Sequence, residues 1–210
     1  MQTNTNNDSL FETDKRLLFL LLCLISFLIL FTKKTFIENQ TAAFEFLQDR
    51  PEGVMLGAIE LIQYVTIPLI YLWKFTVIGF VIWLGSFTFG YRITFTQCWG
   101  IALAGEYVFL IPEIIKNVWF LFFESDPTYK EIVSFYPLSL ATLIDLDTIS
   151  KAYAYPLKAL NLFEIIYWYI LTLGLQAHVK IKQSTAWKII LSSYGILFCG
   201  WLLFYIAVYR

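Results

Sequence analysis

Residues 104–122 read AGEYVFLIPEIIKNVWFLF, an apolar run that contains the ionisable side chains of Glu106, Glu113 and Lys116. The run is close in length to the roughly 20 residues that a helix needs to cross a bilayer. An ionised side chain costs about 3 kcal/mol at the centre of a membrane helix, so its presence there requires a reason. The stretch predicts a membrane-spanning helix whose charges either line a transport path or join helices to one another.

The composition of the whole chain agrees with a membrane setting. Of 210 residues, 59% are hydrophobic and 15% are charged, whereas a soluble domain has about 25% charged residues. The formal net charge of −1 offers no basic surface that would neutralise phosphates, so we expect no nucleic-acid partner. We therefore predict an all-α, polytopic membrane protein whose first partner is the lipid bilayer.

The residues that catalysis and metal binding need are scarce. Cys23, Cys98 and Cys199 lie in apolar runs without a C-x-x-C spacing, and His178 is the only histidine. The sequence has no phosphate-binding glycine loop, no H-E-x-x-H motif and no nucleophile elbow. We expect no enzymatic activity, no metal site and no cofactor.

Five apolar runs predict transmembrane helices within a single membrane domain over residues 17–210. The expected spans are about 17–34, 67–87, 97–122, 159–177 and 186–209. Residues 1–16 are polar and are expected to form a disordered tail. The first run is short enough for a signal peptide, but Lys33 and Lys34 follow it without an A-x-A cleavage pattern, which favours an uncleaved anchor.

Proline positions suggest how the remaining segments are divided. Residues 54–89 are apolar but too long for one perpendicular span, so the run must be divided or strongly tilted. We expect Pro68 to separate an interfacial helix over 53–66 from the second span. The polar connection over 33–53 has room for a short helix that ends before Pro51.

The longest connection, residues 124–158, is semi-apolar and is broken by Pro137 and Pro156. This pattern favours interfacial or re-entrant helices over a sixth span. After the fourth span, Ser184 and Thr185 are expected to cap the last helix.

The polar residues within the spans form the candidate site. Glu113 and Lys116 are three residues apart on one helix, so they are expected to pair, with Asn117 adding hydrogen bonds and Glu106 near an interface. The alternative is a polar path for protons or ions. The candidate cluster comprises Lys74, Glu106, Glu113, Lys116, Asn117 and Glu164.

Two members of this cluster, Glu164 and Lys74, also have simpler interpretations near helix ends. Asn161 and Glu164 fit the cap and first turn of the fourth span, although Glu164 could instead pair with Lys74 or Lys116 across helices. Lys74 could extend to the interface beside an aromatic belt. On the last two spans, the expected close-packing points are Gly174, Gly195 and Gly200.

Two stretches resemble the Yip family of small multispan membrane proteins. Residues 93–118, ITFTQCWGIALAGEYVFLIPEIIKNV, are similar to its third helix. Residues 157–190, LKALNLFEIIYWYILTLGLQAHVKIKQSTAWKII, are similar to its penultimate helix and the basic loop that follows. The resemblance, to a prokaryotic branch, implies five helices and a cytoplasmic N-terminus in a bacterial inner membrane. The density of Lys and Arg near the short connections over 90–94 and 178–185 favours the same orientation.

The expected function follows from this architecture. The leading hypothesis is a non-catalytic scaffold or accessory subunit of Yip type, which binds other membrane proteins or forms a homo-oligomer. The alternative is a small transporter, or a subunit of one, whose path is lined by Glu106, Glu113, Lys116 and Glu164.

Overall fold

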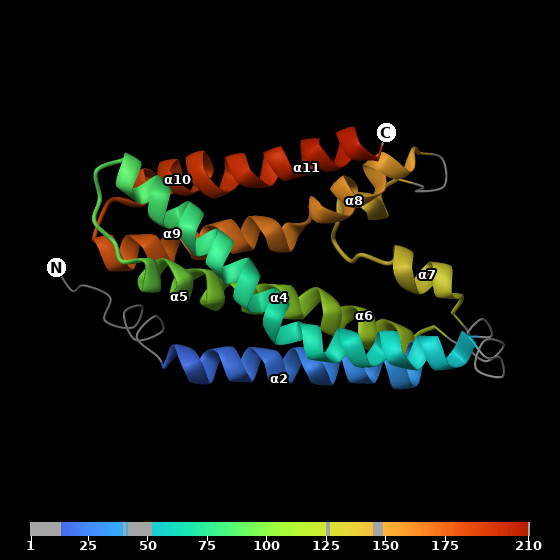
Figure 1. The fold of residues 1–210 in the computed structure, drawn as a ribbon. Coiled ribbons are helices and arrows are strands. Elements are labelled where there is room, and N and C mark those ends of the chain that lie inside the picture. The colour runs from blue at the N-terminus through green and yellow to red at the C-terminus, as the bar shows by residue number, and fades with distance from the viewer. Residues whose placement is uncertain (1–13, 40, 42–51, 125–126, 145–148, 210) are drawn as a thin grey trace.

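The computed structural model describes residues 14–39, 41, 52–124, 127–144 and 149–209. Within these ranges the regular elements are helices, apart from one isolated antiparallel bridge between Ser139 and Asn161. Five helical segments there are long and apolar enough to cross a membrane, which confirms the predicted number. They are Lys15–Glu38, Gly57–Thr88, Phe95–Phe122, Leu162–Val179 and Gln183–Val208. The segments form an elongated bundle (Figure 1).

The first long helix, α2 (Lys15–Lys33), begins where the Asp14 side chain accepts a hydrogen bond from the backbone N–H of Arg16. It continues as a wider, π-helical turn over Lys34–Glu38. Glu38 extends the helix beyond the predicted end because its carboxylate pairs with Lys33 at 3.0 Å and with Lys34 at 3.1 Å. The predicted disordered tail, apart from its last residues, and the short helix before Pro51 lie outside the described residues.

The helix α4 (Glu52–Thr88) is continuous, so the predicted division at Pro68 is wrong. A proline inside a helix removes one backbone hydrogen bond, but packing against neighbouring helices makes this tolerable in apolar helices. Figure 1 shows the first half of α4 beside α2 and the second half crossing the bundle toward α5. The candidate span therefore begins at Gly57, not near Ile67.

The third span contains two helices, α5 (Phe95–Glu106) and α6 (Leu110–Phe122), joined by a 3₁₀ turn over Tyr107–Phe109. Thr94 and Gln97 form a capping box that starts α5, as the Thr-x-x-Gln spacing allows. Pro112 has no N–H to donate to the carbonyl of Val108, so the tighter turn falls where the regular ladder would be incomplete. The helical segment Phe95–Phe122 covers the predicted 97–122 and is long and apolar enough to cross a membrane, with this turn inside it.

Short helices occupy the long connection, as expected. They are α7 (Tyr129–Ser134), a 3₁₀ turn at Leu140–Thr142 and α8 (Lys151–Ala159), and Pro156 lies within α8. Backbone hydrogen bonds of 3.0 Å from Leu140 N–H to Leu160 O and from Leu162 N–H to Leu138 O fix the 3₁₀ turn against the start of α9.

The last two candidate spans are α9 (Leu162–Val179) and a helix composed of α10 (Gln183–Ile190), a π-helical turn (Leu191–Gly195) and α11 (Ile196–Val208). Asn161 caps α9 by accepting a hydrogen bond of 2.9 Å from the Glu164 N–H. Ser184 and Thr185 do not cap α10, because that helix begins earlier, with Lys182 at the cap position and no side-chain cap bond. α10 packs on α9, whereas α11 packs chiefly on α8.

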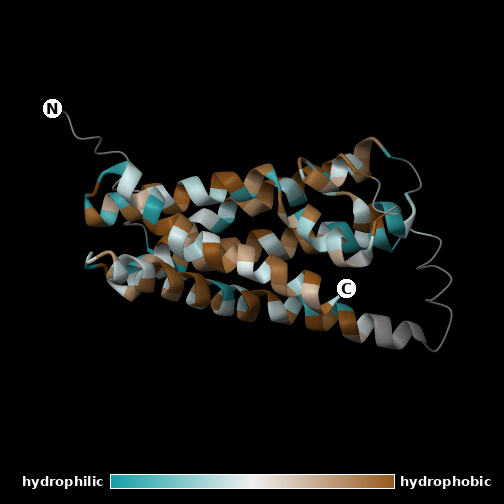
Figure 2. Ribbon diagram, turned by 90° about the horizontal axis from the view of Figure 1, so that it is seen from above, coloured by the Kyte–Doolittle hydropathy of each residue, from teal (hydrophilic) through white to brown (hydrophobic). Residues whose placement is uncertain are grey.

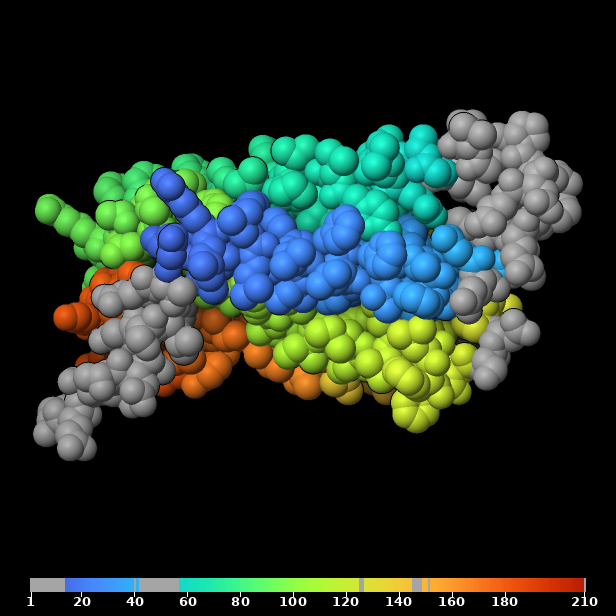
Figure 3. Space-filling model, turned by 90° about the horizontal axis from the view of Figure 1, so that it is seen from below, coloured from blue at the N-terminus to red at the C-terminus, as the bar shows by residue number. Residues whose placement is uncertain are grey.

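Large apolar side chains lie both inside the bundle and on its outer surface. The core includes Leu22, Phe75, Ile82, Ile101, Tyr167, Leu171, Leu175 and Ile189. Exposed side chains such as Trp73 and Leu203 leave the outer faces apolar. Figure 2 shows hydrophobic residues along the length of the bundle and hydrophilic residues gathered at its ends. Figure 3 shows α2 on the surface, between α4 and α6.

Candidate functional site

A partly buried ion pair joins α4 to α5. Lys74 Nζ lies 2.7 Å from Glu106 Oε1 and 4.7 Å from the centroid of the Phe109 ring. The Glu106 side chain is 5% exposed and that of Lys74 is 36% exposed. Glu106 is thus buried in the bundle, and Lys74 reaches this partner instead of extending away from the protein.

Glu164 lies in the first turn of α9, and neither of the two predicted lysines is its partner. Its Oε1 accepts hydrogen bonds from Trp168 Nε1 at 2.7 Å and from the Tyr194 hydroxyl at 2.8 Å. Its Oε2 accepts no hydrogen bond from a described residue. The predicted alternative pairing with Lys74 or Lys116 therefore does not form, and one carboxylate oxygen has unused acceptor capacity.

Tyr167 completes this polar region, to which we refer as the central cluster: Lys74, Glu106, Glu164, Tyr167, Trp168 and Tyr194. The Tyr167 ring is fully buried, 5.1 Å from the centroid of Phe109 and 5.4 Å from that of Tyr194. Among the described residues, neither its hydroxyl nor Glu106 Oε2 has a hydrogen-bond partner. Most buried polar atoms in proteins have a hydrogen-bond partner. These two unpaired atoms therefore mark the central cluster as an unusual part of the interior.

The predicted pair of Glu113 and Lys116 does not form within α6. The Lys116 side chain turns into the protein, where its Nζ lies 5.2 Å from the centroid of the Tyr136 ring. Glu113 is exposed and borders a separate cavity of about 330 Å³ that Lys33 also lines. Asn117 donates to the carbonyl of Ile29 on α2 at 2.9 Å, so it joins helices as expected.

Lys158, on α8, is a site residue that the sequence analysis did not identify. Its Nζ donates to the carbonyl of Val133 at 3.2 Å and lies 4.7 Å from the Tyr136 ring centroid. Burial lowers the pKa of Lys158 and raises the pKa of the Tyr136 hydroxyl. No sequence pattern indicates this arrangement, because the connection between Tyr136 and Lys158 has no periodicity that would bring them together.

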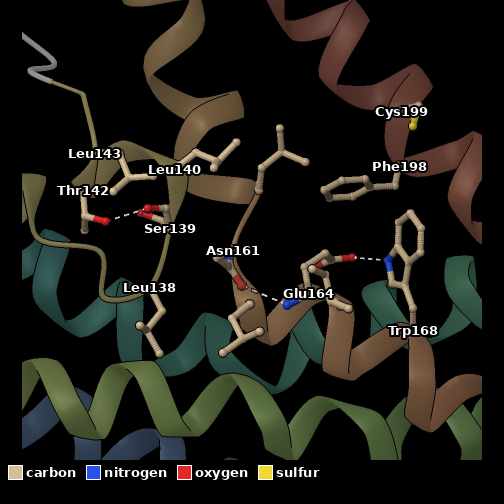
Figure 4. A pocket seen from close by; sticks show the side chains of 13 residues that line it. Leu138, Ser139, Leu140, Thr142, Leu143, Asn161, Glu164, Trp168, Phe198 and Cys199 are labelled. Atoms are coloured by element: carbon tan, nitrogen blue, oxygen red, sulfur yellow. Dashed lines mark hydrogen bonds between the residues drawn. The ribbon is translucent and has the colours of Figure 1, made fainter.

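Two cavities border the central cluster. The first, here called the apolar cavity, has a volume of about 560 Å³ and lies between the 138–143 segment, α9 and α11 (Figure 4). The second, here called the lysine cavity, has a volume of about 550 Å³ and is lined by Lys74 and Lys158. Asn161, Glu164 and Phe198 line both. Glu164 is therefore the ionisable residue at the boundary between them.

The structure thus brings together Lys74, Glu106 and Glu164 of the predicted site and places Glu113, Lys116 and Asn117 elsewhere on α6. Among the described residues, no group of three or more His, Cys, Asp or Glu side chains could hold a metal ion. The central cluster can hold helices together and can offer a carboxylate oxygen to a ligand.

No protein-family model, curated protein or solved structure matches this chain. The resemblance to the Yip family rests on the two sequence stretches alone.

Proposed function

We propose that this protein is a multi-pass integral membrane protein that acts as a non-catalytic scaffold or accessory subunit of Yip type. The five apolar helices and the apolar outer faces support insertion in a bilayer, for which we propose a bacterial inner membrane with the N-terminus in the cytoplasm. The binding partners are other membrane proteins or further copies of this chain.

The 2.7 Å contact between Lys74 and Glu106 carries the proposal. An ion carrier needs charged groups that exchange partners with a cargo, whereas here the cation and one carboxylate neutralise each other between α4 and α5. Glu164 is likewise held by two hydrogen bonds to Oε1. Such fixed contacts hold the helices in one arrangement, which suits an architecture that presents its outer faces to partners.

A small transporter is the second candidate, and the position of Glu164 between two cavities favours it. In that function the unpartnered oxygen of Glu164 would receive a cargo group from one cavity and release it to the other. Lys74 would line the same path and Glu106 would hold it there, whereas Glu113 and Lys116 lie elsewhere on α6.

Purification in mild detergent distinguishes the two functions. The scaffold proposal expects stoichiometric membrane-protein partners that remain bound to a Glu164→Gln variant, because the glutamine carbonyl still accepts the Trp168 and Tyr194 hydrogen bonds. Transport predicts a protein without such partners that dissipates an ion gradient in liposomes, with the flux abolished by Glu164→Gln. Flux of that kind would overturn the scaffold proposal.

A further inference from the structure

A crevice lies between the last two helices of the bundle. α10 packs along α9, but beyond the π-helical turn at Leu191–Gly195 the helix continues as α11 and packs chiefly on α8. The apolar cavity and the lysine cavity both occupy this region, and Glu164 and Phe198 line each of them. The crevice therefore has an apolar part and a charged part that share a boundary.

The apolar part opens at the outer surface of the bundle. Its lining includes Leu143, which is 80% exposed, and Ile165, which is 62% exposed. Figure 4 shows the opposite wall, where Phe198 and Cys199 of α11 face the segment that carries Leu140 and Leu143. A volume of about 560 Å³ is within the range of roughly 300 to 1,000 Å³ that small-molecule sites have. A hydrocarbon chain can enter it directly from a surrounding bilayer.

The charged part presents two groups with opposite requirements. Lys158 Nζ forms no ion pair with a described carboxylate, and its hydrogen bond goes to the neutral carbonyl of Val133. Glu164 Oε2 accepts no hydrogen bond from the described part of the chain, although Glu164 is only 7% exposed. An ammonium group near an apolar wall favours an anion, and a carboxylate oxygen favours a hydroxyl or ammonium donor.

We propose that the crevice binds one phospholipid whose headgroup carries a hydrogen-bond donor beside its phosphate, of the phosphatidylethanolamine or phosphatidylglycerol class. The phosphate binds Lys158, the ammonium or hydroxyl group donates to Glu164, and one acyl chain occupies the apolar cavity. A headgroup that lacks a hydrogen-bond donor could bind Lys158 through its phosphate but could not donate to Glu164. This inference rests on the membrane location proposed above, but not on the scaffold function.

Lipid titration of the full-length protein, delipidated in detergent, tests the inference. Native mass spectrometry counts the lipid molecules retained when phosphatidylethanolamine, phosphatidylglycerol or phosphatidylcholine is added. We expect the first two to bind roughly tenfold more tightly than phosphatidylcholine, because its quaternary ammonium cannot donate to Glu164. Glu164→Gln should remove this preference. The glutamine carbonyl keeps the position of Oε1, so an NH2 group, which donates and does not accept, takes the place of Oε2.

Two further variants test the two ends of the site. Lys158→Gln should weaken the binding of every phospholipid by roughly tenfold, whereas the exposed Lys182→Gln should not. Cys199→Phe should reduce retention by filling the apolar cavity, and Leu203→Phe, on the same helix but lining neither cavity, is its matched control. The proposal would be overturned if the wild-type protein bound all three lipids equally and if Lys158→Gln left that binding unchanged.

Soluble headgroups separate a lipid site from a phosphate site. Glycerophosphoethanolamine and inorganic phosphate, at the same concentrations, should leave the melting temperature of the wild-type protein unchanged, whereas phosphatidylethanolamine should raise it. A rise of equal size with either soluble anion would show that the crevice binds free phosphate and would overturn the lipid assignment. Neither result depends on whether partner proteins co-purify, so the scaffold function is tested separately.

Discussion

Lys74 and Glu106 illustrate how two charged residues can be accommodated between apolar helices. Each ion would be costly alone, but the Nζ–Oε1 distance of 2.7 Å allows a charge-assisted hydrogen bond. The two partners are unequally buried, at 36% and 5% exposure. Loss of one partner should therefore have a different consequence from loss of the other.

Lys74→Met should destabilise the protein more than Glu106→Gln. The first change leaves a carboxylate buried without its cation, at a cost of about 3 to 5 kcal/mol, whereas the second leaves a lysine whose side chain is 36% exposed and lines the lysine cavity. The double variant should recover most of the loss. A double-mutant cycle on thermal unfolding in detergent measures the coupling. The cycle for Glu113→Gln and Lys116→Met is the control, and coupling there as large as that for Lys74 and Glu106 would contradict the structure.

Lys158 should make stability depend on pH in lipid-free detergent. Burial lowers its pKa in the folded protein, so at pH values below the usual Lys pKa of about 10.4 the unfolded chain binds more protons there. The free energy of unfolding should consequently rise with pH across that window. Lys158→Gln should lose this rise and should exceed the wild-type stability most at the lower pH values. Unfolding curves from roughly pH 7 to pH 10 check this, and an unchanged slope in the variant would contradict it.

At the scale of the helices, one close approach depends on Gly105, which the sequence analysis did not single out, and two of the predicted glycines, Gly195 and Gly200, make no close contact. A Cβ atom at Gly105 would lie 2.6 Å from the Tyr167 ring, whereas one at Gly200 would meet nothing within 4 Å. A Cβ at Gly195 would make only ordinary contacts, the nearest at 3.7 Å. The tight contact between α5 and α9 therefore depends on Gly105, beside the central cluster.

Gly105→Ala should destabilise the protein by about 1 to 3 kcal/mol, because the fully buried Tyr167 ring has little room to move. Gly200→Ala is the matched control, since alanine favours a helix by up to about 1 kcal/mol over glycine and meets no obstacle there. Thermal unfolding of both variants in the same detergent provides the comparison. Equal effects would show that α5 and α9 do not approach as closely as described.

Local signals in the sequence predicted the ends of several helices but not the directions of their side chains. Asn161 caps α9 because a cap depends on neighbours within three residues. Pro68 failed as a boundary because α2 and α5 support α4 on either side of it. The pairing of Glu113 with Lys116 failed for the same reason, since α6 directs Lys116 toward Tyr136 on the long connection. Such contacts depend on packing between distant segments, which one sequence does not reveal.

At the scale of the whole molecule, the short connections lie at one end of the bundle. Figure 1 places the start of α2, the connection between α4 and α5, and the connection between α9 and α10 at that end, with α7 and α8 at the other. Lys15 Nζ donates to the carbonyl of Thr96 at 2.9 Å, which joins the starts of α2 and α5. This common end is the one for which the distribution of Lys and Arg favours the cytoplasm.

Cysteine labelling in intact cells tests this orientation. In a background without Cys23, Cys98 and Cys199, single cysteines within 90–94 and 180–185 should be protected from an impermeant external reagent. Cysteines at positions 130 and 150 should react. Permeabilised cells control for residues that are inaccessible in the fold, and the reverse pattern in intact cells would invert the proposed topology.

The peripheral position of α2 has a consequence for the order of assembly during synthesis. Its polar contacts come from helices that the ribosome makes later: Tyr71 bonds Ser26 at 2.8 Å, Tyr107 donates to the Leu18 carbonyl at 2.7 Å, and Asn117 donates to Ile29. In the proposed membrane setting, the first helix to emerge would therefore acquire all of these contacts only after the third candidate span has been inserted. A chain divided between Thr41 and Glu52 should consequently still assemble when both fragments are co-expressed, with the α2 fragment recovered on the tagged remainder, and Asn117→Leu should weaken that recovery.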